Sequence, residues 1–159
     1  MIVLGVDPGI ALTGWGVLKK EDEPELLAYG CIKTSKNNEL QARLLQIFCE
    51  FQDIVKKFKP EIICLEKLFF NTNAKTAFSI GEARGVIKIC AALNKIKIAE
   101  FTPLQIKNTI VGYGRAEKIQ VQQMVKVLLK LDEIPQPDDA ADGIATALTY
   151  CSFNRSLVK

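Results

Sequence analysis

The stretch that most constrains the fold of this chain is residues 2–18. Residues 2–6 are an apolar run rich in β-branched side chains, long enough for one buried strand. Asp7 follows directly, Pro8-Gly9 breaks the strand pattern, and residues 13–18 predict a second strand that returns beside the first. Because burying an unpaired carboxylate is costly, Asp7 is either an ordinary turn residue or part of a site that compensates its charge.

Composition limits the chemistry that this chain can perform. It has 159 residues, of which 48% are hydrophobic and 25% charged, so residues 1–159 are expected to form one globular domain. The complete absence of histidine excludes a histidine general base, a Ser-His-Asp triad and a histidine zinc ligand. A net charge of +3 permits a nucleic-acid partner without requiring one.

Cysteine usage and targeting patterns bear on location. The five cysteines are scattered within apolar patterns and form no Cys-x-x-Cys pair, which favours reduced thiols. No apolar run reaches the roughly eighteen residues of a membrane span, and the first residues lack the pattern of a secretory signal. We therefore expect a cytoplasmic protein with no membrane partner.

Hydrophobic periodicity predicts the order of helices and strands along the chain. Strands are expected over residues 2–6, 13–18, 26–34, 61–66 and 96–101. Helices are expected over residues 39–58, with Asn38 as the cap, 75–94, 103 to about 112, 116–131 and 138–150. This order predicts an α/β fold, with a five-stranded mixed sheet, an antiparallel edge and helices on both faces.

Four acids stand out because of where they fall in this pattern. Asp7 and Glu66 each end a buried strand, and the two strands are expected to be parallel neighbours, so both acids would lie at one sheet edge. Asp139 and Asp142 are three residues apart at the start of the last helix and can project from one helical face. Taken singly, the helix pair is explained by favourable placement in a first turn, and Glu66 by a salt bridge with a lysine.

Clustered carboxylates without histidine favour a particular kind of site. Four such groups would repel one another strongly in a low-dielectric environment, and divalent cations would relieve that repulsion. Oxygen ligands favour Mg²⁺ or Mn²⁺ over zinc. Two such ions about 4 Å apart are a standard arrangement for phosphodiester hydrolysis.

Several short motifs then resemble one family in its own order along nearly the whole chain. They are residues 5–9, 13–16, 65–69, 80–85, Lys107 with 111–114, 116–118 and 139–142. In these motifs the chain is similar to RuvC, the bacterial Holliday junction resolvase family. The resemblance implies a ribonuclease-H-like fold, a homodimer, Mg²⁺ or Mn²⁺, and symmetric nicking of four-way DNA junctions in recombination and repair.

The resemblance also implies roles for individual residues. The catalytic and metal-binding acids would be Asp7, Glu66, Asp139 and Asp142, with two ions per active site. Residues that contact DNA would be Phe69, Lys107 and Lys118. An aromatic in a polar loop can stack on unpaired bases, and lysines near the acids can contact phosphate, which agrees with these assignments.

The remaining implications concern assembly and register. The helix over 75–94 would form the dimer interface, with Gly81 and Gly85 on its small face, and a RuvA–RuvB branch-migration complex would be a possible partner. An extra acid, Asp138, blurs the register of the last motif. We expect Asp138 to be the N-cap of the last helix and Asp139 to be its first helical residue.

Three other functions compete with this interpretation. A ribonuclease-H-like or transposase-type nuclease would act on another substrate, and the match along nearly the whole chain argues against it. An actin-like ATPase also opens with an Asp-x-Gly strand turn, but it needs two such domains. A catalytically inactive junction-binding module would not require the complete set of acids.

Overall fold

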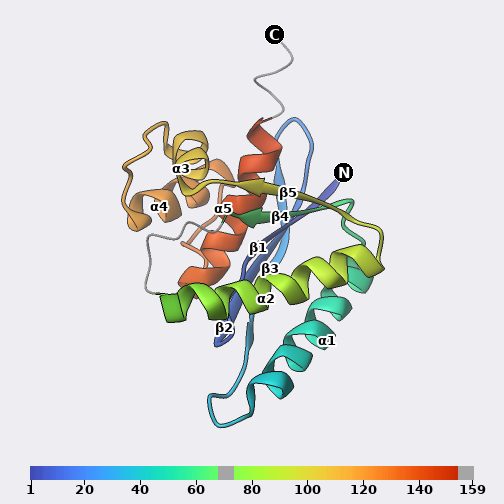
Figure 1. Cartoon of the computed structure of the whole chain (residues 1–159). Coiled ribbons are helices and arrows are strands. Elements are labelled where there is room, and N and C mark those ends of the chain that lie inside the picture. The colour runs from blue at the N-terminus through green and yellow to red at the C-terminus, as the bar shows by residue number, and fades with distance from the viewer. Residues whose placement is uncertain (68–73, 154–159) are drawn as a thin grey trace.

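The protein is built around one five-stranded mixed sheet, as its computed structural model describes it for residues 1–67 and 74–153 (Figure 1). The strands are β1 (Ile2–Asp7), β2 (Leu12–Lys19), β3 (Glu25–Lys33), β4 (Ile62–Glu66) and β5 (Lys97–Phe101). The helices are α1 (Leu40–Phe58), α2 (Ala74–Leu93), α3 (Pro103–Val111), α4 (Lys118–Leu128) and α5 (Asp138–Phe153). The sheet order is β3-β2-β1-β4-β5, with β1 to β3 antiparallel and β4 and β5 parallel to β1.

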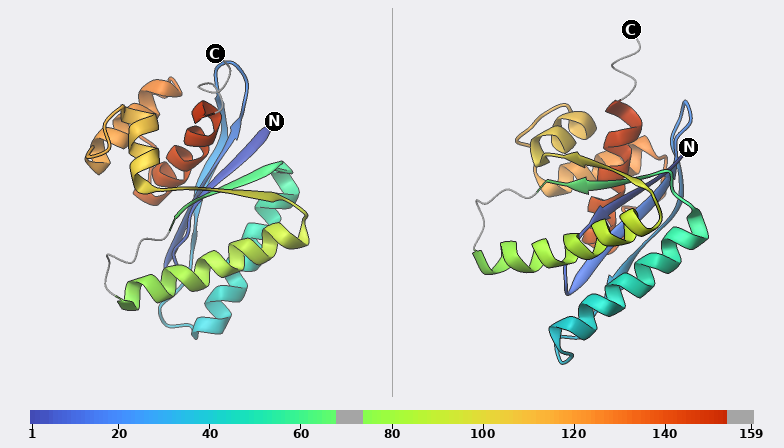
Figure 2. Two further views of the ribbon diagram at one scale, coloured as in Figure 1. Left: turned by 45° about the horizontal axis from the view of Figure 1, so that its top comes forward. Right: turned by 45° about the vertical axis from the view of Figure 1, so that its right-hand side comes forward.

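Helices cover both faces of this sheet (Figure 2). On one face α1 and α2 pack against side chains such as Leu4 and Ile63. On the other face α3, α4 and α5 pack against side chains such as Val3 and Cys64. The architecture predicted from the order of elements is therefore confirmed. Within the described residues, no helix combines the length and the apolar character that crossing a membrane requires.

Side-chain alternation along β1 and β4 decides where their terminal acids point. Val3 belongs to the core under α5, so Asp7, four residues later on the same strand, projects toward that face. The same parity places Glu66 on the face of Cys64, which belongs to the same core. Because β1 and β4 pair in parallel with matched ends, the two acids meet at one edge of the sheet.

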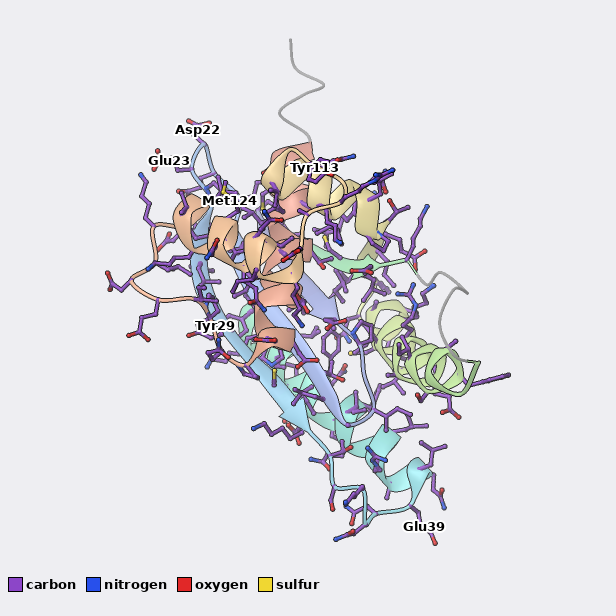
Figure 3. The ribbon with its side chains drawn as sticks, turned by 90° about the vertical axis from the view of Figure 1, so that its left-hand side faces the viewer. Asp22, Glu23, Tyr29, Glu39, Tyr113 and Met124 are labelled. Atoms are coloured by element: carbon purple, nitrogen blue, oxygen red, sulfur yellow. The ribbon has the colours of Figure 1, made fainter. Side chains whose placement is uncertain are left out.

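Helix α5 lies very close to β1 and β2 because glycines line the strands beneath it (Figure 3). A Cβ atom at Gly5 would be 2.1 Å from the carbonyl oxygen of Gly143, and one at Gly14 would be 1.9 Å from that of Asp139. These separations leave no room for any side chain. The glycines therefore let the backbone of α5 rest on the sheet, with its first turn beside the end of β1.

The helices α3 and α1 differ in how they are capped. Thr102 caps α3, since its hydroxyl accepts the N–H of Gln105 at 3.0 Å. The prediction that Asn38 caps α1 is wrong, because Glu39 occupies the cap position and makes no side-chain capping bond (Figure 3). Asn38 lies in the preceding turn, where its N–H donates to the carbonyl of Ser35 at 3.2 Å.

The glycine contact yields a testable prediction. We expect Gly14→Ala to lower the free energy of unfolding by about 1–3 kcal/mol or more, because the new methyl group must displace the backbone of α5. Urea unfolding measures this loss. Gly30→Ala is the matched control on β3, where the added Cβ would meet only the ring of Trp15, at 3.0 Å, which can move. Equal losses in the two variants would show that α5 does not depend on the close approach.

Candidate active site

Asp7 lies half-buried at the end of β1 and faces α5. Its pKa is raised from the usual 3.8 to about 7, first by burial and then by the charges of Asp142, Asp139 and Glu66. Lys118 acts in the opposite direction. Each of the other three acids is thus close enough to perturb Asp7, and the structure brings the four carboxylates predicted from the sequence into one site.

Two of these acids are themselves perturbed. Burial raises the pKa of Glu66, as does the charge of Asp142, whereas Lys107 and Arg84 lower it. Burial also raises the pKa of Asp142, and together with the charges of Asp139 and Asp138 it outweighs the hydrogen bond and positive charge of Lys118. The site therefore favours binding a proton or a cation over leaving its carboxylates bare.

Lys118, the first residue of α4, supplies a positive charge to the acid cluster. Its Nζ lies 2.8 Å from Oδ2 of Asp142 and 3.6 Å from Oδ2 of Asp138. Burial alone would lower the pKa of Lys118, but the hydrogen bond and charge of Asp142 raise it overall. The ammonium group therefore stays charged and offsets part of the repulsion among the acids.

The start of α5 corrects the expected register of its acids. The N–H of Ala140 donates to the carbonyl of Pro137 at 2.9 Å, so the first turn closes on Pro137 and the helix begins at Asp138. The predictions that Asp138 is the N-cap and that Asp139 is the first helical residue are wrong, because the helix already includes Asp138, whose carboxylate pairs with Lys118. Asp139 remains the first-turn acid whose charge raises the pKa of Asp7.

Two cavities flank the acids. The first has a volume of about 290 Å³ and is lined by Glu66, Lys107, Lys118 and Asp142 with apolar side chains of α3, α4 and α5. The second, of about 500 Å³, is lined by residues 9–12, Arg43, Ser79 and Asp139, among others. Two of the four acids, Glu66 and Asp142, therefore line the first cavity, and Asp139 lines the second.

A divalent cation needs several oxygen ligands gathered around one point. Within residues 1–67 and 74–153, no three histidine, cysteine or acidic side chains are gathered into a ready-formed metal cage. Asp142 is instead paired with Lys118. The chemistry of the donors nevertheless fits a hard cation, because all four are carboxylates, and burial together with their mutual repulsion raises the pKa of Asp7.

Comparison with known proteins identifies the family. The sequence model of the family described as "Crossover junction endodeoxyribonuclease RuvC" matches residues 3–150. The chain belongs to the RuvC family. Its relatives with that name include proteins of Caldanaerobacter subterraneus, 49% identical over 99% of this chain and 96% of the relative, and of Caldicellulosiruptor saccharolyticus, 47% identical over 99% and 96%.

Solved structures of the RuvC family match the fold closely. Thermus thermophilus RuvC is 32% identical and superposes with a TM-score of 0.91 over 98% of this chain and 96% of that one. The same protein in complex with Holliday junction substrate is 30% identical, with a TM-score of 0.89 over 98% and 96%. The predicted resemblance and the ribonuclease-H-like fold are both confirmed, and an actin-like ATPase is excluded. Membership of the RuvC family implies dependence on divalent metal ions in general.

The other RuvC-type residues expected from the sequence fall into three groups. Lys107 lines the first cavity, where its charge lowers the pKa of Glu66. Gly81 and Gly85 lie on α2, where an added Cβ at either would meet nothing within 4 Å. Phe69 lies outside the described residues, so its role stays a prediction.

Arg84 is a contact residue of the site that has no role in the sequence-based assignments. Its guanidinium donates to the backbone carbonyl of Glu66, the acid at the end of β4. The only sequence sign was that Arg84 belongs to the RuvC-like motif over residues 80–85. Nothing in the periodicity of α2 indicates that this side chain reaches the neighbouring strand.

The raised pKa of Asp7 makes the stability of the metal-free protein depend on pH. A carboxyl whose folded-state pKa is about 7 against 3.8 stabilises the fold below pH 4, and that contribution is lost as the pH rises through 7. We therefore expect Asp7→Asn to melt at a higher temperature than the native chain at pH 8 in EDTA, and to show a flatter profile from pH 4 to 8. Asp53→Asn, on the exposed side of α1, is the control and should parallel the native profile. A native-like profile for Asp7→Asn would contradict the electrostatic account.

Proposed function

We propose that this chain is a metal-dependent endonuclease that resolves four-way (Holliday) DNA junctions by symmetric nicking, in recombination and repair. The observation that carries the proposal is the set of four carboxylates acting on one another at the ends of β1, β4 and α5. Membership of the RuvC family supports it. So does the close likeness to a RuvC structure described as a complex with Holliday junction substrate.

The proposed reaction is hydrolysis of a phosphodiester. Asp7, Glu66, Asp139 and Asp142 would hold two Mg²⁺ or Mn²⁺ ions. When bound, such ions lower the pKa of an attacking water and stabilise the departing oxygen. Water attacks phosphorus, the bond from phosphorus to the 3′ oxygen breaks, and the products are a 5′ phosphate and a 3′ hydroxyl.

DNA contacts would surround this centre. Lys107 and Lys118 line the same cavity as Glu66 and Asp142, where their charges can bind the phosphate backbone beside the scissile bond. Phe69 follows the end of β4 in sequence, and we propose that it stacks on unpaired bases at the crossover. Both roles agree with a substrate that combines a charged backbone with accessible bases.

A homodimer would supply two such sites. The stripe formed by Phe78, Gly81, Gly85, Ile89 and Leu93 follows helical spacing along α2. Its three large apolar members are 76%, 58% and 64% exposed, and the glycines leave space beside them. Packing this stripe against its copy about a two-fold axis would cover it and direct two sites at two strands. A cytoplasmic location and docking of a RuvA–RuvB complex complete the proposal.

Metal dependence and substrate choice test this function together. We expect the protein with Mg²⁺ to nick a labelled four-way junction in symmetric pairs, and to leave linear duplex and RNA–DNA hybrid intact. With EDTA or Ca²⁺, a gel shift should still detect junction binding while nicking stops, because binding depends on lysine charge and not on hydrolysis.

Each of the alternative functions gives its own result in this assay. Cutting of the hybrid would indicate a nuclease of another substrate class. Binding without cutting in either Mg²⁺ or Mn²⁺ would indicate an inactive junction-binding module. Full cleavage in EDTA would contradict the metal site.

The adjacent acids of α5 provide a sharper test. We expect Asp139→Asn to abolish junction cleavage while leaving junction affinity unchanged. Asp139 would be a metal-binding acid, and its charge already raises the pKa of Asp7 in the same site. Asp138→Asn loses a partner of Lys118 at 3.6 Å and a charge that acts on Asp142, but Asp138 is not among the charges that raise the pKa of Asp7, so this variant should still nick junctions. Single-turnover cleavage and gel-shift affinity distinguish the two variants. Cleavage by Asp139→Asn together with inactivity of Asp138→Asn would shift the metal-binding register by one residue.

A further inference from the structure

Arg84 is a buried cation on α2 that joins three elements. It is 7% exposed, and its two terminal nitrogens contact different partners. Nη1 donates to the backbone carbonyl of Glu66 at the end of β4, and Nη2 lies 2.5 Å from the carboxylate of Glu100 on β5. One guanidinium therefore ties α2 to the ends of two adjacent parallel strands.

The alternation of the sheet places Arg84 behind the catalytic candidates. Phe101 belongs to the core under α5, so Glu100 projects to the opposite face, where α2 packs. The side chain of Glu66 points to the α5 face, but its carbonyl oxygen lies at the strand edge within reach of Arg84. Arg84 thus holds the backbone that carries the acid, from the far side of the sheet.

The neighbouring peptide is held as well. The N–H of Lys67 donates to the carbonyl of Phe101 at 2.7 Å, which continues the pairing of β4 with β5 past Glu66. The last carbonyl of β4 and the N–H that follows it therefore both have partners. These two hydrogen bonds fix the peptide group that joins Glu66 to Lys67.

The ion pairs around Glu100 keep the guanidinium in place. Lys88, one turn after Arg84 on α2, lies 2.9 Å from the same carboxylate oxygen. A buried guanidinium is costly without such partners, so the ion pair with Glu100 stabilises the buried charge of Arg84. Lysine cannot reproduce the contact, because a guanidinium binds two acceptors through separate nitrogens in one plane, whereas an ammonium is a single point charge.

We propose that Arg84 is a positioning residue for Glu66: by binding its carbonyl from the opposite face of the sheet, it sets the orientation in which the Glu66 carboxylate meets a metal ion. The inference rests on the proposed function, in which Glu66 is a metal-binding acid. Groups that orient metal ligands in this way affect metal affinity without touching the metal.

The test compares Arg84→Lys with Lys88→Gln and measures metal affinity as well as cleavage. We expect Arg84→Lys to raise the Mg²⁺ concentration for half-maximal junction cleavage by about tenfold. The midpoint of Mg²⁺-induced thermal stabilisation should rise in parallel, while junction affinity in EDTA stays within about twofold of native. Lys88→Gln removes a cation from Glu100 but leaves the bond to Glu66, so both midpoints should change by less than about twofold.

Each other outcome has a definite meaning. A lower melting temperature of Arg84→Lys with native Mg²⁺ midpoints would show a purely structural role and overturn the inference, as would equal midpoint shifts in Lys88→Gln. If Arg84→Lys does not fold, Glu100→Gln takes its place: the guanidinium loses its carboxylate anchor, so the midpoints should rise, and unchanged midpoints overturn the inference. Glu66→Gln separates the two hypotheses, because native cleavage and native metal midpoints in that variant would refute the proposed metal site itself.

Discussion

The backbone contact between α5 and the glycine-lined strands β1 and β2 is the feature on which the site depends. Burial of apolar side chains such as Ile144 and Leu148 draws the helix onto the sheet. The missing side chains at Gly5 and Gly14 set how close it comes. The acids of the first turn of α5 are therefore held beside the end of β1 by packing that lies outside the acid cluster itself.

The same packing gathers carboxyl groups in a partly buried site, where negative charge is unfavourable. Burial and mutual repulsion raise the pKa of Asp7, Glu66 and Asp142. Lys118 and Lys107 offset part of that effect from α4 and α3. The fold thus carries a locally unfavourable cluster that the hydrophobic cores on both faces must sustain, a common trade between stability and activity.

Much of this arrangement could be predicted from the sequence, because it depends on local patterns. Apolar runs that end in Asp7 and Glu66 predict two buried strands and, through parallel pairing, one shared edge. The start of α5 was harder to predict, because either Asp138 or Pro137 could precede the first turn. Only the hydrogen bond from the N–H of Ala140 to the carbonyl of Pro137 decides between them. The contact of Arg84 with β4 depends on how α2 crosses behind the sheet, which no spacing within a helix encodes.

The order of the acids along the chain has a consequence for protein synthesis. The strand acids belong to the first half of the sequence, whereas Asp139 and Asp142 arrive with α5, after every strand of the sheet. A chain that has not yet synthesised α5 therefore contains all five strands but only two of the four clustered acids. Under the proposed function, a chain that ends before α5 lacks two of the four metal-binding acids and cannot cut DNA.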